Sequence, residues 1–358
     1  MFMPKPLRSF CLLLYACLLA ASLLCLAGGC AAPGRAPGEG SGPAPVSAQN
    51  FLLDTLVTIT IYDRDDRSVI EEAFDEISRL ENILSAAVPG SDPDRLAQHA
   101  GGDYIEVSEY TAFLLTESAR YTRASEGAFD CTVGPLVSLW GIKDSKGHYP
   151  SPEELAEALP LIDNGGVLIK DHNMVMLKNA GMKVDFGAVA KGYIADRVKD
   201  LLVDRGIGSA VIDLGGNIVL IGSKPDGTPF RIGARDPAKG AADYFGVFEV
   251  SDISLVSSGS YERFFVYEGK AYHHILDVHT GFPADNDLLQ VTILSGLSVA
   301  GDGFSTTAFL LGLDRGLRLI NDTEGIEGVF VTKDKKVYVS DGIGDIFTIV
   351  SADYTLAE

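Results

Sequence analysis

An uncharged apolar run from Ser9 to about Ala27, preceded by Lys5 and Arg8, most restricts what this chain can fold into. A charged start followed by an apolar stretch is typical of an export signal, which does not join the fold. The alternative is a membrane anchor of marginal length, because about 20 apolar residues span a bilayer. In either case we expect the globular part to lie outside the cytoplasmic membrane.

The apolar run ends in LAGGC, which resembles the lipobox of bacterial lipoproteins. The resemblance implies a signal peptide over residues 1–29 and lipidation of Cys30. We therefore expect an exported protein that is lipid-anchored to a bacterial membrane and faces the periplasm or the cell exterior. Residues 30–49 are rich in Pro, Gly and Ala, which predicts a flexible tether. Cys131 is the one other cysteine outside the leader, so we expect no internal disulfide.

Residues 50–358 are enough for one large domain or two closely merged lobes. Apolar spacing predicts helices over 68–85, 108–125, 151–162, 191–206 and 301–312. Strand patterns occupy 57–62, 166–170, 174–178, 209–222, 229–237, 244–259, 261–277, 287–296, 326–343 and 345–350, and a short strand is expected near 183–186. Residues 127–142 are expected to be irregular. This pattern predicts an α+β fold with largely antiparallel sheets and flanking helices.

The formal net charge of −20 at pH 7 argues against nucleic acid as a partner. An anionic ligand would therefore need positive charge close to its binding site. A metal ion or a few well-placed lysines would supply it.

The segment VDFGAVAKGY, residues 184–193, places Asp185 at a strand end and Lys191 at the start of a helix. Small residues let the backbone approach a ligand closely, and a helix N-terminus with a lysine suits phosphate. The glycine spacing of a Walker A loop is absent. A tight structural turn explains the same residues without any ligand.

Three of the six histidines lie within seven residues, at His273, His274 and His279. Their spacing does not match a zinc site. Strand alternation sends His273 and His274 to opposite faces, so at most one of them faces a given pocket. That one is a candidate general base near neutral pH, and hydrogen-bonded histidines at a strand end are the alternative.

Asp302 and Thr306 lie four residues apart within GDGFSTTAFLLG, residues 301–312, and so share one side of the predicted helix. Asp302 is favoured by the positive end of a helix, and the Thr306 hydroxyl can bond to a carbonyl one turn earlier. The pair alone therefore does not distinguish a site from a solvated face.

Five ordered segments together resemble the ApbE-type flavin transferases, which are FAD:protein FMN transferases. These segments are GAFDCTVGPLVSLWG, VDFGAVAKGYIAD, SSGSYERFF, HHILDVHTGFP and GDGFSTTAFLLG, and they span most of the chain from residue 51 to 345. The resemblance implies a single large ApbE-like domain, related to the T-fold, over residues 50–358.

In that family, FAD lies with its pyrophosphate on Mg2+, and a Thr or Ser hydroxyl of an exported or membrane-bound flavoprotein attacks the phosphorus on the FMN side. The resemblance implies that Asp302, Thr306 and the backbone carbonyl of Ala188 hold Mg2+. It implies that His274 takes the hydroxyl proton. The implied FAD contacts are Leu53, Ala128, Phe129, Asp130, Asp185, Lys191 and Ile275.

Two residues depart from the family pattern. Ala87, in LSAAVPG, stands where the family carries an aromatic residue that stacks on the flavin, and Val278 stands where proline is usual. The first departure leaves two other functions open beside FMN transfer to an acceptor with a Thr/Ser flavinylation motif. They are hydrolysis of FAD to FMN and AMP, and flavin binding without turnover. Retention of Asp302, Thr306 and His274 argues against pure binding.

Overall fold

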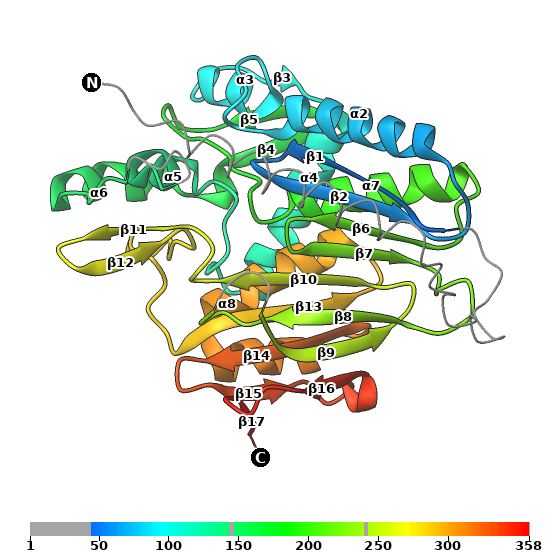
Figure 1. Ribbon diagram of the computed structural model, residues 1–358. Helices are drawn as coiled ribbons and strands as arrows, with labels where there is room; N and C mark the ends of the chain where they lie inside the picture. Colours follow the sequence, from blue (N-terminus) through cyan, green and yellow to red (C-terminus); the bar gives the residue numbers. More distant parts are fainter. Residues whose placement is uncertain (1–43, 143–146, 240–242, 358) are drawn as a thin grey trace, which may run out of the picture. The chain divides into compact units, whose positions relative to one another are not determined.

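The computed structural model describes residues 44–142, 147–239 and 243–357, and its centre is a nine-stranded sheet. In sheet order the strands are β1 (Val46–Leu52), β2 (Thr55–Ile61), β6 (Ala210–Leu214), β7 (Asn217–Ile221), β10 (Ser254–Gly259), β13 (Leu288–Ser295), β14 (Ile326–Thr332), β15 (Lys336–Val339) and β17 (Thr355–Leu356). All neighbours are antiparallel except β15 and β17 (Figure 1). The largely antiparallel sheet predicted from the sequence is confirmed.

Three smaller sheets accompany it, and each is antiparallel throughout. They consist of β16 (Phe347–Ile349), β9 (Tyr244–Val250) and β8 (Phe230–Arg235); β3 (Ile105–Glu106), β5 (Met174–Leu177) and β4 (Val167–Lys170); and the hairpin β11 (Phe264–Tyr267) with β12 (Lys270–His273).

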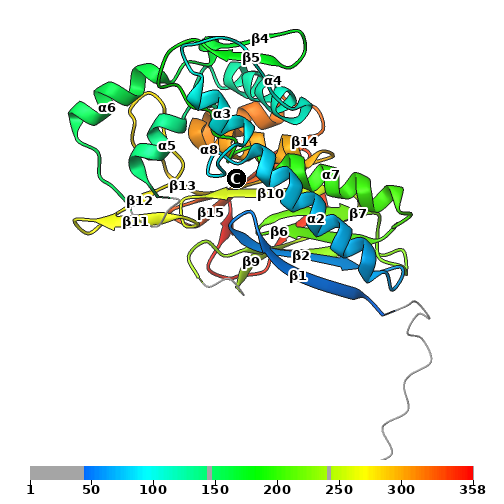
Figure 2. The same ribbon diagram turned by 90° about the horizontal axis from the view of Figure 1, so that it is seen from above.

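The described helices are α2 (Arg67–Leu84), α3 (Asp92–Gln98), α4 (Glu109–Ala124), α5 (Gly134–Trp140), α6 (Pro152–Ala158), α7 (Ala190–Asp204) and α8 (Ser298–Asn321), with short 3-10 turns at Leu159–Leu161, Asn164–Gly166 and Gly344–Ile346. Helices α7 and α8 contact each other and the central strands, and α2 lies on α7 and β1 (Figure 2). None of the helices in the described ranges is both long and apolar enough to cross a bilayer.

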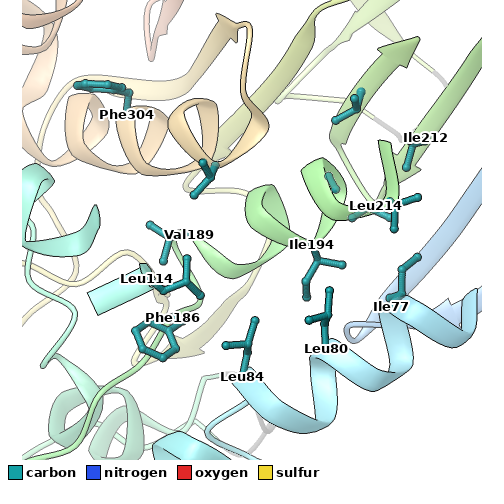
Figure 3. Packing of buried hydrophobic residues seen from close by; sticks show 14 of the residues in the cluster. Ile77, Leu80, Leu84, Leu114, Phe186, Val189, Ile194, Ile212, Leu214 and Phe304 are labelled. Carbon is teal, nitrogen blue, oxygen red and sulfur yellow. The ribbon is translucent and has the colours of Figure 1, made fainter. Parts of the chain in front are cut away.

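Alternation along the central strands divides the core into two layers. On β14, Phe330 joins the cluster under the helices, whereas Val329 and Val331 join the cluster shared with β8, β9 and β16. In the first cluster, Leu80 of α2 points toward Ile194 of α7, and Ile77 and Leu84 lie on either side of it along α2 (Figure 3). The central sheet is therefore covered on both faces, which holds α7 and α8 rigidly.

A third cluster joins α5, α6 and the β11–β12 hairpin around Trp140, which is fully buried. The indole Nε1–H donates to the carbonyl of Gly281 at 2.7 Å. The ring of Tyr272 lies 5.6 Å from the Trp140 ring. Figures 1 and 2 both show these four elements together at one end of the sheet. The hairpin is thus fixed by aromatic packing on one face.

Several helix boundaries follow the sequence signals. The side chain of Ser108 caps α4, and Ser151 opens α6 in a capping box with Glu154, with Pro152 at its first position. The helix near residue 301 is longer than predicted: it starts at Ser298 and continues to Asn321 through a break at Gly312, where φ is +74°.

Four predictions about individual segments differ from the structure. The tether expected over 30–49 overlaps β1, which begins at Val46 because its Ser47 and Gln49 side chains bond to β2 and its alternate residue Ala48 is buried. Residues 134–140 form α5 rather than irregular chain. Residues 183–186 make only an isolated bridge at Lys183. The last strand is β17, not the segment 345–350. The expected signal peptide and Cys30 lie outside the described residues.

Candidate active site

Helices α7 and α8 cross so closely that only glycine fits at the crossing. A Cβ atom on Gly192 would lie 2.3 Å from the carbonyl oxygen of Ser298 and 2.7 Å from Cβ of Asp302. The N–H of Gly192 donates to Oδ2 of Asp302 at 2.8 Å. The first turn of a helix has no internal partners for its N–H groups, so Asp302 caps α7 from outside.

Glycines on both sides of Asp302 seat α8 against its neighbours. A Cβ atom on Gly303 would lie 2.3 Å from the ring of Tyr121, and one on Gly301 would lie 2.8 Å from the side chain of Val256. The hydroxyl of Tyr121 donates to the carbonyl of Val299 at 3.2 Å. The close contacts of Gly301 and Gly303 therefore fix the position of α8, and with it the direction in which Asp302 points.

Asp302 is only 5% exposed, and its charge is costly there. Burial raises the pKa of its carboxyl, while the charge of Lys191 and the Gly192 N–H oppose that rise. Among the described residues, Oδ1 has no hydrogen-bond partner, yet it is not sealed from solvent. A positively charged ligand at this oxygen would stabilise the carboxylate.

Thr306 lies one turn further along α8, next to a small hydroxyl cluster. Its Oγ1 is 3.2 Å from Oγ of Ser258 on β10, and Ser258 is 2.8 Å from Oγ of Ser305. The hydroxyls of Ser258, Ser305 and Thr306 thus lie together, one turn along α8 from Asp302.

Two adjacent histidines after β12 have different environments. For His273, Nε2 bonds to the carbonyl of Ala284 at 3.0 Å and Nδ1 accepts from the N–H of Ile275 at 3.3 Å, so both ring nitrogens are used within the fold. Burial lowers the pKa of His273 further. The half-buried His273 is therefore neutral, and both of its ring nitrogens bond within the fold.

His274 is held by the backbone of Arg263. Its main-chain N–H donates to the carbonyl of Arg263 at 3.1 Å, and its Nδ1 lies 3.2 Å from the same oxygen. Because a carbonyl only accepts, Nδ1 carries the proton in the neutral ring and Nε2 is the basic nitrogen. In this tautomer Nε2, not Nδ1, is the nitrogen that can take up a proton.

The turn between β1 and β2 lies beside Arg263, the residue that binds His274. Leu53 and Asp54 both have positive φ, +56° and +55°, as a two-residue type I′ turn demands. The N–H of Leu53 donates to Glu81, and the carbonyl of Asp54 lies 3.5 Å from the guanidinium of Arg263. Bulky leucine is rare in this conformation, so the surrounding contacts hold the turn in a strained shape.

The ApbE family model matches residues 53–330 of this chain, which is more than half of its length. The chain belongs to the ApbE family. It is 33% identical over 328 residues to the FAD:protein FMN transferase of Treponema pallidum, with 87% of this chain and 91% of the relative covered. A Klebsiella pneumoniae protein of the same name is 33% identical over 290 residues, covering 81% and 90%.

Solved structures of the ApbE family have the same α+β fold. The ApbE protein of Thermotoga maritima superposes with a TM-score of 0.77 at 31% identity, covering 83% of this chain and 97% of its own. The flavin transferase ApbE from Vibrio cholerae gives 0.75 at 27% identity, covering 85% and 99%. The family resemblance and the fold class are confirmed.

Three of the predicted FAD contacts of this ApbE-family chain, Ala128, Phe129 and Asp130, lie in the loop between α4 and α5. The ring of Phe129 is 3% exposed and packs edge-on against Tyr121, and both carboxylate oxygens of Asp130 accept bonds from Thr132 and Asn164. Both side chains therefore have partners within the fold, and Ala128 beside them is half-buried. The FAD contact itself stays a prediction.

Asp185, Ala188 and Ile275 also stay predictions with defined surroundings. The N–H of Asp185 donates to the carbonyl of Cys131 at 2.8 Å, and its Oδ1 accepts from Gly187 at 2.8 Å. Ala188 lies half-buried in the turn that opens α7. Ile275 is 6% exposed. Cys131 is buried and unpaired, and burial raises the pKa of its thiol to about 12, so it is not a nucleophile at neutral pH.

The sequence reasoning did not single out Glu262, which the structure brings to the site. Although Glu262 as a whole residue is exposed, desolvation at the site raises the pKa of its carboxyl, with the charges of Lys191, Arg235 and Arg263 opposing the rise and that of Asp302 adding to it. Glu262 lies within SSGSYERFF, so the motif itself could have indicated it. Lys191 thus stands near three carboxylates, since burial also raises the pKa of Asp213 and the charge of Lys191 opposes that rise.

Among the described residues, no group of three or more His, Cys, Asp or Glu side chains is arranged to hold a metal ion. The predicted set of carboxylate, hydroxyl and main-chain carbonyl differs from such clusters, because it has a single acid. Its oxygens are nevertheless the donors that Mg2+ prefers. The partly desolvated Oδ1 of Asp302 fits one cation, which would counter the burial cost of the carboxylate.

Proposed function

We propose that this chain transfers FMN from FAD to a Thr or Ser hydroxyl of an exported or membrane-bound flavoprotein and releases AMP. The observation that carries the proposal is the combination of a fixed Nε2 base at His274 with a buried carboxylate whose Oδ1 remains open at Asp302. The relatives named FAD:protein FMN transferase support the substrate and the reaction type.

In this reaction, a bond forms between the acceptor oxygen and the FMN phosphorus, and the bond from that phosphorus to the AMP phosphate oxygen breaks. Nε2 of His274 receives the hydroxyl proton, because Arg263 holds the proton on Nδ1. Asp302, Thr306 and the carbonyl of Ala188 would hold Mg2+. The bound ion supplies charge compensation for the diphosphate.

Positioning is the other contribution of the chain. Phosphoryl transfer depends mainly on alignment and charge stabilisation, and both helices that bring the site together are locked by glycine crossings. Lys191 adds a positive charge on the first turn of α7, beside Asp302. This explains how a protein with a net charge of −20 would accept an anionic cofactor.

FAD hydrolysis is the second candidate, and Ala87 favours it. The residue is exposed and follows a short turn in which its N–H donates to Ser85, so its side chain offers no ring for flavin stacking. A less firmly held flavin would admit water in place of the protein hydroxyl.

One experiment separates these functions from flavin binding without turnover. The purified chain is mixed with FAD, Mg2+ and a candidate FMN-binding domain, and flavin fluorescence is read on a denaturing gel while AMP is quantified. Labelled acceptor with equimolar AMP supports transfer. AMP and free FMN without label support hydrolysis, and neither product supports a binder.

We further propose that the chain is an exported lipoprotein attached to the membrane through Cys30. The apolar run and the LAGGC sequence support this proposal. Metabolic labelling with palmitate tests it: the wild type should incorporate label, and Cys30→Ala should not.

A further inference from the structure

One short connection joins the two halves of the candidate site. Residues 258–263 carry the chain from the end of β10 to the start of β11. At one end, Oγ of Ser258 lies 3.2 Å from Oγ1 of Thr306, which is a candidate cation ligand. At the other end, the carbonyl of Arg263 accepts from the main-chain N–H of His274 at 3.1 Å and lies 3.2 Å from its Nδ1. The spacing between the cation position and the base therefore depends on the shape of this connection.

Tyr261 lies in the middle of the connection, and its ring folds back over the end of β10. A Cβ atom on Gly259 would lie 2.4 Å from Cε1 of this ring, so the missing side chain lets the ring approach the strand. The guanidinium carbon of Arg235 lies 5.3 Å from the ring centre, within the range of a cation–π contact. These two contacts hold the ring against the end of the strand.

The hydroxyl of Tyr261 joins a chain of polar side chains in the central sheet. It donates to Oε1 of Gln290 on β13 at 2.9 Å, and Nε2 of Gln290 donates to Oγ1 of Thr292 at 2.9 Å. Oγ1 of Thr292 lies 2.8 Å from Oγ of Ser257. Gln290 is 1% exposed and Thr292 is 3% exposed. A buried amide oxygen that loses its donor is costly, so Gln290 holds the Tyr261 hydroxyl in one place.

The connection has little other anchoring beyond this hydroxyl. An amide oxygen only accepts, so Tyr261 has to stay protonated. Burial raises the pKa of its phenol, with the charge of Glu262 adding to the rise and that of Arg235 opposing it. Glu262 is itself exposed. Tyr261 is therefore the last side chain bonded into the core before the carbonyl of Arg263.

We propose that Tyr261 is a positioning residue for the base and acts through its hydrogen bond to Gln290. This bond fixes the carbonyl of Arg263, and that carbonyl fixes the ring of His274. The inference rests on the proposed function, because only a reaction with a general base needs this ring in one place. Misplacement by about 1 Å can slow a reaction about 100-fold, so the loss of a single anchoring bond is enough to lower kcat.

Removal of one hydroxyl tests the role of Tyr261. Tyr261→Phe keeps the ring and its contact with Arg235 and removes only the bond to Gln290. Its matched control is Tyr354→Phe, because the Tyr354 hydroxyl also donates to a buried acceptor, Asp236, in the core cluster shared with β8, β9 and β16. Both variants are assayed with FAD, Mg2+ and the candidate FMN-binding domain, and their melting temperatures are recorded.

We expect the two variants to lose a similar few degrees of melting temperature, since each loses one buried hydrogen bond. Only Tyr261→Phe should lower kcat for FMN transfer, by about tenfold or more, while the KM for FAD stays within about twofold. An unchanged kcat in Tyr261→Phe overturns the inference, and so does an equal fall in Tyr354→Phe. A rise in KM at constant kcat would also overturn it, because Tyr261 would then act on FAD binding.

A double-mutant cycle separates positioning from stability. Gln290→Leu removes the acceptor, and its combination with Tyr261→Phe replaces both partners, so that no acceptor is left without its donor. The double variant should regain part of the stability that Tyr261→Phe loses. Its kcat should nevertheless stay within about twofold of that of Tyr261→Phe. Losses in kcat that multiply would mean that the two residues act separately, contrary to the inference.

Hydrogen exchange tests the same bond without turnover. The main-chain N–H of His274 donates to Arg263, and that of Gly281 donates to the carbonyl of Asp277 at 2.8 Å. In Tyr261→Phe, exchange at His274 should be about tenfold faster or more, while Gly281 keeps its wild-type rate. Equal rates at His274 in both proteins contradict the inference. Failure of the proposed function is distinct, because the wild type itself would then neither label the acceptor nor release AMP.

Discussion

Asp196 on α7 and Asp302 on α8 each accept hydrogen bonds from the first turn of the other helix. Asp196 uses both oxygens, one for the N–H of Ser298 at 2.7 Å and one for that of Val299 at 2.9 Å. Asp302 uses one oxygen for Gly192, and its other oxygen stays in contact with solvent. Asp196 thus forms a complete cap, in which both carboxylate oxygens accept bonds from α8. Asp302 forms a half-filled cap, in which only one oxygen accepts a bond from α7.

The difference shows how a fold can orient a carboxylate while only one of its two oxygens accepts a hydrogen bond. A cap orients the side chain and lowers its entropy, so an unfilled oxygen next to it is already aimed. The adjacent histidines also have different partners: the ring nitrogens of His273 bond to Ala284 and Ile275, whereas Nδ1 of His274 bonds to the carbonyl of Arg263.

Replacement of the half-filled cap should have the largest effect on activity. Asp302→Asn keeps an oxygen for the Gly192 N–H but removes the negative charge that a cation needs. We expect FMN transfer to fall about 1000-fold or more, since several kcal/mol of charge stabilisation depend on the bound ion, while the melting temperature stays within a few degrees. Acceptor labelling and thermal unfolding measure the two effects.

The control for this variant is Asp196→Asn, which alters the complete cap. It should keep the transfer rate within about twofold. Comparable activity in wild type and Asp302→Asn would remove the cation assignment and with it the contrast between the two acids.

The next effect concerns the two histidines. His274→Gln should lower kcat on the order of 100-fold, because a positioned general base contributes at least that much. His273→Gln should instead lower the free energy of unfolding by about 1–2 kcal/mol, since the half-buried hydrogen bonds to Ala284 and Ile275 are lost. Steady-state labelling and urea unfolding distinguish them, and the reverse pattern would assign the base to His273.

The sequence predicts which residues belong to the candidate site better than it predicts how they are arranged in space. Spacing identifies Asp302 and Thr306 on one helix side, and Ser108 and Ser151 as caps, because these depend on neighbours within one turn. The crossing at Gly192 depends on residues 110 positions apart, so no local pattern shows it. Sequence alternation also cannot give the hydrogen-bond partners of His273 and His274, because Ala284 and Arg263 lie elsewhere in the chain.

Glycine 192 sets how closely the two caps approach each other. Gly192→Ala places a methyl group 2.3 Å from the carbonyl of Ser298, so the helices must separate. We expect a loss of about 1–3 kcal/mol in unfolding free energy from overpacking, together with a lower transfer rate, because Asp302 moves with α8. Urea unfolding and acceptor labelling give the two values.

A matched control for this change is Gly296→Ala, where an added Cβ would meet no atom within 4 Å. It should alter neither stability nor transfer. If Gly192→Ala behaves in the same way, the close crossing does not position Asp302, and the fixed geometry argued for the half-filled cap loses its basis.

The smallest effect is a pH dependence that belongs to the complete cap. Burial raises the pKa of Asp196 from 3.8 to about 6, with the N–H groups of Val299 and Ser298 opposing and the charge of Asp200 adding to the rise. Between these two values the folded chain binds the proton more tightly than the unfolded chain. The contribution to stability is therefore full below pH 3.8 and is lost as pH rises through 6.

The variant Asp196→Asn tests this pH dependence, because its amide side chain does not titrate. Measured by urea unfolding from pH 4 to 6.5, the stability difference should shift in favour of the Asn variant by up to about 3 kcal/mol. A constant difference would mean that the two N–H groups already compensate the buried charge, and the two acids would then differ only in the oxygen that Asp302 leaves open.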